Sequence, residues 1–137
     1  MRSVAAVLAG FITLSVAIYT MQGVGTAVLR QMNPDLPATA SIVNYVTGTR
    51  VFWLIWETAS MMAAGYVTAR IAASSHVVHA IVMGAIQAIV TLSAMSSIQS
   101  EEPMWFWLTG IVLMIPAAWL GGLLRVKRSA SVRTPSP

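Results

Sequence analysis

Four long apolar stretches account for most of this 137-residue chain, and they constrain its fold more than any other feature. They cover residues 4–29, 51–73, 77–98 and 104–124. A helix needs about 20 mostly apolar residues to cross the hydrocarbon core of a bilayer, and each stretch has that length. The sequence therefore predicts an all-α protein, a four-helix transmembrane bundle with up-down-up-down topology.

Composition excludes a water-soluble domain. Hydrophobic residues make up 57% of the chain and charged residues only 9%, whereas soluble domains carry about 25% charged residues. We expect residues 1–128 to form one transmembrane domain, and residues 129–137, rich in Ser, Thr and Pro, to form a disordered cytoplasmic tail. Cysteine is absent, which excludes disulfide and thiol chemistry.

The distribution of charge predicts the topology. If the amino terminus is cytoplasmic, four spans leave only two basic residues outside, Arg30 and Arg50. The acidic residues of the connections, Asp35, Glu101 and Glu102, all lie on this outer side. The inner side then holds Arg2, Arg70, Arg125, Lys127, Arg128 and Arg133. This positive-inside bias predicts a multi-pass membrane protein with both termini in the cytoplasm. The net charge of +4 is explained by topology and does not indicate nucleic acid binding. The lipid bilayer is the expected partner, and the basic cluster at residues 125–128 is expected to be attracted to anionic lipid.

Helix-breaking residues and short connections delimit the spans. Pro34 and Pro37 predict the end of the first helix and a long connection after it. Ser74-Ser75-His76 is so short a link that spans two and three must be antiparallel neighbours. Pro103 suits the first position of the last helix. The tryptophans near the outer boundary, Trp53, Trp56, Trp105 and Trp107, are interpreted as interfacial anchors.

Small residues recur four apart in every span. The pairs and triplets are Ala6/Gly10, Gly65/Ala69/Ala73, Ala80/Gly84/Ala88, Ala117/Gly121 and Ala118/Gly122. In lipid, helices associate by close backbone approach at such positions. The seams serve either packing within one bundle or, where one is left over, association with a second copy or another membrane protein.

The segments 63–70 and 117–125 resemble each other. Each closes a span with small residues and an aromatic residue before an arginine. Either the likeness is a coincidence of composition, or the two hairpins form a parallel repeat.

Glu57 is the one acidic residue inside a predicted span. It lies six residues past Val51, about 9 Å below the outer boundary at the helical rise, and it shares its helix face with Ala64 and Thr68. Tyr19 and Gln22 are predicted at a similar depth. Glu57 is therefore a candidate ion or proton site within an intramembrane polar layer. The structural alternative is a hydrogen bond to a neighbour, or a contact with Arg50.

The other polar residues predict no catalytic or metal site. Gln87, near the middle of span three, is a candidate for tying two helices together or lining a pore. His76 and His79 have a spacing that suits one metal ion, but no third ligand lies on their side. Because no nucleophile–base set or carboxylate pair occurs, we expect no enzymatic activity and no cofactor.

A combination of short motifs resembles a group of small bacterial inner-membrane proteins with four spans. The motifs are A-G-Y-V-T-A-R-I-A at residues 64–72, His79-Ala80 with Gly84, Pro103 with Trp105, and P-A-A-W-L-G-G at residues 116–122. The group has no assigned activity, and Glu57 is not part of its pattern. The resemblance implies the fold and the location only.

Two functional interpretations follow. The favoured one is a non-enzymatic packing or accessory subunit that associates with itself or with another membrane protein. The alternative is a small oligomeric transporter or channel that uses Glu57, similar to the four-span multidrug exporters, which however carry their glutamate in the first span.

Overall fold

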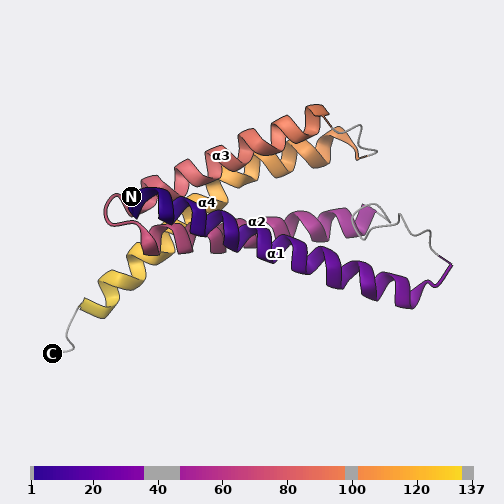
Figure 1. Ribbon diagram of the computed structural model, residues 1–137, viewed down its shortest axis with the longest axis horizontal. Coiled ribbons are helices and arrows are strands. Elements are labelled where there is room, and N and C mark those ends of the chain that lie inside the picture. The colour runs from indigo at the N-terminus through magenta and orange to yellow at the C-terminus, as the bar shows by residue number, and fades with distance from the viewer. Residues whose placement is uncertain (1, 36–46, 98–101, 134–137) are drawn as a thin grey trace.

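The computed structural model describes residues 2–35, 47–97 and 102–133, which form four α-helices and no strand. The helices are α1 (Arg2–Met32), α2 (Thr47–Ile71), α3 (His76–Ser97) and α4 (Met104–Arg133) (Figure 1). The prediction of an all-α chain is confirmed for these ranges, and each helix overlaps one of the four apolar stretches.

Two of the helix ends show why the chain turns where it does. At the end of α1 the backbone N–H of Asn33 still donates to the carbonyl of Leu29 at 3.0 Å, but Pro34 has no N–H with which to continue the helix. Between α2 and α3 the chain reverses within residues 72–75, where Ser75 has a left-handed φ of 47°. Helices α2 and α3 are in contact, as their short link predicts.

The end of α4 differs from the prediction. The helix continues to Arg133, beyond the expected span end at residue 124 and into the segment expected to be a disordered tail. The Ser129 and Ser131 hydroxyls donate to the carbonyls of Arg125 and Arg128, each at 3.0 Å. No proline or glycine interrupts residues 123–133, so nothing ends the helix there. Residues 134–137 of the expected tail lie outside the described residues.

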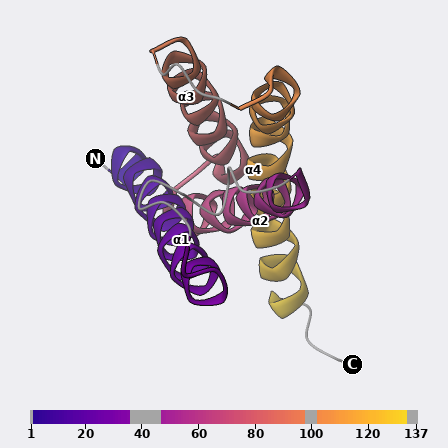
Figure 2. The same ribbon diagram turned by 90° about the vertical axis from the view of Figure 1, so that its right-hand side faces the viewer.

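The helices converge at one end and spread apart at the other (Figures 1 and 2). We call the end that holds the start of α1 and the end of α4 the terminal end, and the opposite end the distal end. Helices α2 and α4 run in the same direction, since both begin at the distal end. Helices α2 and α3 each contact all three others, whereas α1 and α4 do not contact each other. The most extensive contact in the bundle is that between α2 and α4.

Glycines set how closely α2 and α4 cross. A Cβ placed on Gly65 of α2 would collide with the backbone of Ala118, and one placed on Gly121 of α4 would collide with the carbonyl oxygen of Met62. Around this crossing the core is built from methionine, leucine and alanine, namely Leu14, Met61, Ala64, Met83, Ala88, Met114, Ala117 and Ala118. The close backbone approach expected of small residues in lipid is thus present between these two helices.

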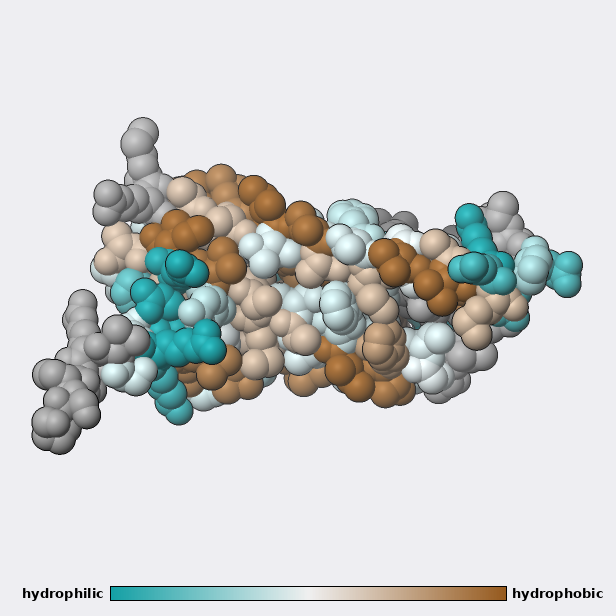
Figure 3. All heavy atoms as spheres, turned by 90° about the horizontal axis from the view of Figure 1, so that it is seen from below, coloured by the Kyte–Doolittle hydropathy of each residue, from teal (hydrophilic) through white to brown (hydrophobic). Residues whose placement is uncertain are grey.

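The surface of the bundle is apolar along its length. Large apolar side chains such as Ile12, Ile89 and Val112 are more than half exposed. On the face in Figure 3 the most hydrophilic side chains gather at the two ends, with apolar and weakly polar ones between them. Three helices, α1, α3 and α4, are long and apolar enough to cross a membrane. Helix α2, which contains Arg50, Glu57 and Arg70, is not among them.

Candidate functional site

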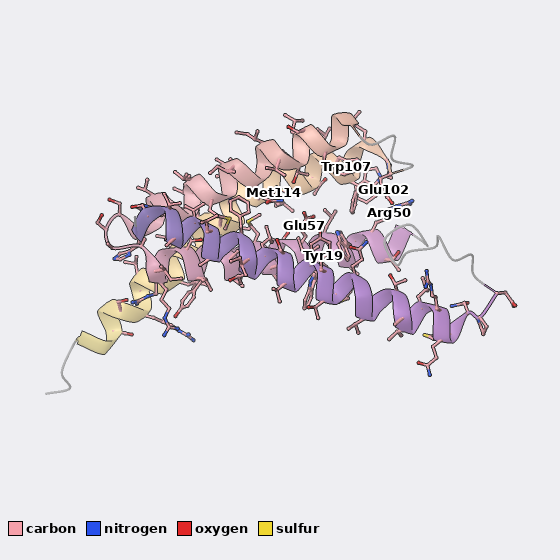
Figure 4. The ribbon with its side chains drawn as sticks, in the orientation of Figure 1. Tyr19, Arg50, Glu57, Glu102, Trp107 and Met114 are labelled. Carbon is pink, nitrogen blue, oxygen red and sulfur yellow. The ribbon has the colours of Figure 1, made fainter. Side chains whose placement is uncertain are left out.

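Glu57 lies on the face of α2 that packs against α4, as its predicted helix face requires. Figure 4 shows it between these helices, in a narrow crevice lined also by Thr58, Met61, Gly110, Leu113 and Met114. Gly110 lies beside the carboxylate: a Cβ at that position would lie 3.5 Å from Oε2 of Glu57, an ordinary van der Waals distance. The crevice has no volume in which a water-sized sphere fits.

The Glu57 carboxylate is unpaired within the described part of the chain. No hydrogen bond or ion pair joins it to another described residue. The neighbouring Thr58 hydroxyl donates to the carbonyl of Leu54 at 2.7 Å instead. A charged carboxylate at such depth in a bilayer costs a few kcal/mol on insertion scales, and such groups usually face the bundle interior or a cavity. Glu57 therefore combines an interior position with the absence of an internal partner.

The other candidates for a polar layer do not join Glu57. Tyr19 is 71% exposed on the surface of α1, and Gln22 on the same helix is half-buried. The Gln87 side chain donates to the hydroxyl of Thr91, one turn along α3, at 3.4 Å. No recorded hydrogen bond links any two of Glu57, Tyr19, Gln22 and Gln87, so the described residues do not form the layer by direct bonds.

Arg50 pairs with Glu102 and not with Glu57. Its Nε donates to Oε2 of Glu102 at 2.6 Å, and the two side chains are 20% and 7% exposed. The other carboxylate oxygen, Oε1, is buried without a hydrogen-bond partner. The ion pair joins the start of α2 to the residues before α4 at the distal end (Figure 4). A sequence signal for it exists, since opposite charges stand near the starts of two helices that the predicted up-down-up-down topology places at the same end of the bundle.

Trp56 joins two helices and is more than an interfacial anchor. Its indole Nε1–H donates to the backbone carbonyl of Ala17 on α1 at 3.2 Å. The carbonyl of Ala17 also belongs to the hydrogen-bond ladder of α1, so the indole adds a second donor to it. This bond was not expected from the sequence. One feature of the sequence could have indicated it: Trp56 lies about 9 Å past Arg50 at the helical rise, which is deep for a residue that only marks the membrane boundary.

The contacts of α2 and α4 have the pattern that a parallel repeat would produce. The two close contacts are reciprocal: Gly65 of α2 meets Ala118 of α4, and Gly121 of α4 meets Met62 of α2. Gly65 then stands on α2 where Gly121 stands on α4, and Met62 where Ala118 stands. The first helix of each hairpin also packs through a glycine: Gly10 brings α1 against α2, and Gly84 brings α3 against α4.

The histidines near the α2–α3 link do not assemble a metal site. Nδ1 of His79 lies 3.1 Å from the carbonyl of Ser75. Within residues 2–35, 47–97 and 102–133, no three His, Cys, Asp or Glu side chains gather where they could hold a metal ion.

Comparison with models of known protein families, with curated proteins and with solved structures finds no match to this chain.

Proposed function

We propose that this protein is a non-enzymatic membrane protein that packs, within the bilayer, against a second copy of itself, and that another membrane protein is the alternative partner. The observation that carries the proposal is an uncovered seam on the distal half of α1. Tyr19, Gly23 and Ala27 lie four residues apart on this helix, and all three are exposed. We call these three residues the α1 seam.

The α1 seam differs from the other small-residue seams in that none of the described helices covers it. Gly10, Gly65, Gly84, Gly121 and Gly122 are all buried against neighbouring helices. A Cβ on Gly23, in contrast, would meet nothing within 4 Å. Small residues allow close backbone approach between helices in lipid, where hydrophobicity alone gives little drive for association. A seam left open on the surface is therefore suited to a partner helix.

The proposal places all four helices across a bacterial inner membrane with both termini in the cytoplasm. The positive-inside bias of the sequence supports this orientation. The position of Glu57 supports the crossing of α2, because this half-buried side chain lies against α4 and not on the open surface of α2. The resemblance to small four-span inner-membrane proteins agrees with this location.

Association through the α1 seam is tested by enlarging its small residues. The double variant Gly23→Leu/Ala27→Leu prevents backbone approach but leaves the bundle intact, since neither residue packs inside it. The matched control is Ala5→Leu, which alters an exposed small residue at the other end of α1. We expect the wild type to have at least twice the 14.6 kDa mass of one chain in mild detergent, the control to match it, and the double variant to be monomeric.

A wild type that is monomeric in both detergent and bilayer would refute self-association. If the wild type instead carries one different membrane protein, and the double variant loses it, the seam serves a heteromeric partner. If the double variant keeps the wild-type mass, the seam is not the interface.

One observation favours the alternative, a small oligomeric transporter or channel with Glu57 as its ion or proton site. The carboxylate has an interior position and no recorded partner. The crevice beside it, however, has no room for water, which is why packing is the first proposal. In proteoliposomes, cation or proton flux that Glu57→Gln abolishes and Glu102→Gln preserves would establish this function. Absence of flux in the wild type would eliminate it.

A further inference from the structure

A groove opens between α2 and α4 at the terminal end, away from both Glu57 and the α1 seam. Its volume is about 380 Å³, and it is lined by Met62, Ala63, Tyr66 and Val67 of α2 and by Leu124 and Arg128 of α4. It arises because α4 crosses α2 closely at Gly121 and then extends away from the other helices, as the yellow end of α4 shows in Figure 1. Small-molecule pockets have volumes of about 300–1,000 Å³, so the groove is large enough for part of a lipid.

The lining of the groove changes in character along the helix axis. Arg128 lies one turn beyond Leu124, about 6 Å further toward the terminal end. Met62 lies one turn deeper than Tyr66, toward the middle of the bundle. A cation therefore stands at the mouth, and apolar side chains together with the Tyr66 ring line the groove further in. This order matches the order of a phospholipid, whose phosphate precedes its acyl chains.

The charge around the mouth selects for a negative ligand. Arg125 and Lys127 lie within the same turn as Arg128, and Arg70 ends α2 at the same end of the bundle. The acidic side chains that the structure describes, Asp35, Glu57 and Glu102, lie toward the distal end or within the bundle. Arginine forms paired hydrogen bonds to phosphate oxygens, and basic pockets between transmembrane helices bind anionic headgroups.

We propose that this groove is a binding site for one anionic phospholipid. The phosphate lies at the Arg128 guanidinium, the Tyr66 hydroxyl supplies a second hydrogen-bond donor, and an acyl chain lies against Met62, Ala63 and Val67. The proposal does not depend on self-association, because the groove belongs to a single chain and lies on different helices from the α1 seam.

The test measures lipid retained by the purified protein in native mass spectrometry. The probes are phosphatidylglycerol and phosphatidylcholine with identical acyl chains, added in equal amounts. Arg128→Gln removes the cation at the mouth, and Lys127→Gln removes an equal charge from the same turn without touching the groove. Ala63→Phe fills the groove and leaves every charge in place, with Val67→Phe as a second filling variant. Helix content by circular dichroism and a single elution peak identify the variants that fold.

We expect the wild type and Lys127→Gln to retain phosphatidylglycerol in preference to phosphatidylcholine. Arg128→Gln should reduce that preference about fivefold, as expected for one basic residue near a membrane surface. A folded groove-filling variant should lose both bound lipids. Equal losses in Arg128→Gln and Lys127→Gln would show diffuse surface attraction and overturn the site. Unchanged lipid binding in folded groove-filling variants would overturn it as well.

Discussion

Among single residues, the glycines at the helix crossing have the largest structural effect. At Gly65 and Gly121 the atoms that a side chain would meet belong to the backbone of the opposing helix. A flexible side chain can rotate away from a new methyl group, but a helix backbone can give way only if the whole helix moves. The spacing of these small residues was visible in the sequence. Which of them face a neighbouring helix depends on how each helix is rotated in the bundle.

The substitution Gly121→Ala should therefore destabilise the folded protein. Its new methyl group would collide with the Met62 carbonyl oxygen, and overpacking of this kind costs about 1–3 kcal/mol. The matched control is Gly48→Ala, because a Cβ on Gly48 would meet nothing within 4 Å. Thermal unfolding in detergent measures the difference. A melting temperature of Gly121→Ala equal to that of the control would contradict the close crossing.

Among the helices, α2 and α4 form the central pair, and two different contacts hold them together. The glycines bring their middles into backbone contact, and the Arg50–Glu102 ion pair joins their distal ends. The sequence predicted the existence of both helices, the approximate limits of α2 and the start of α4, because apolar length and proline positions are local properties. It did not predict that they would be parallel neighbours, since no short link joins them. Without knowing that α4 lies beside α2, the sequence suggests Arg50 as a possible partner of Glu57. In the structure Arg50 forms its ion pair with Glu102, just before α4.

Breaking this ion pair should affect its two partners unequally. Arg50→Gln leaves the Glu102 carboxylate, which is only 7% exposed, without its cation, and an unsatisfied buried charged group costs about 1–3 kcal/mol or more. Glu102→Gln should cost less, because Arg50 is more exposed and a glutamine oxygen still accepts a hydrogen bond.

The measurement is a double-mutant cycle on thermal unfolding. We expect Arg50→Gln/Glu102→Gln to be less destabilised than the sum of the two single variants. Strict additivity would mean that the pair contributes no coupling and that the two helix starts are held by other contacts.

For the whole molecule, the arrangement places polar side chains of α2, the least apolar helix, against other helices. Helix α2 is in contact with α1, α3 and α4, and its Thr68 and Ser60 are buried among them. A polar side chain that faces other helices is less costly than one that faces lipid. The start of α1 and the end of α4 both lie at the terminal end (Figure 1).

The topology can be tested with single cysteines, since the natural chain has none. We expect a membrane-impermeant maleimide to label Asp35→Cys on spheroplasts, and to label Ser75→Cys and Ser131→Cys only after the membrane is opened. All three positions are exposed. Asp35 lies at the distal end of the bundle, and Ser75 and Ser131 lie at the terminal end. Labelling of Ser131→Cys on intact spheroplasts would show that the number of crossings is odd or that the orientation is inverted.

The helical class, the order of the helices and the end of α1 follow from local sequence. In lipid every backbone N–H and C=O must find its partner within the segment, so a long apolar run becomes a helix whatever lies beside it. The partners of Arg50, Trp56 and Glu57 follow instead from the rotation and crossing of whole helices. A side chain projects from only one side of a helix, so a small rotation replaces its neighbours, and that rotation is set by the combined packing of glycines and methionines distributed over all four helices.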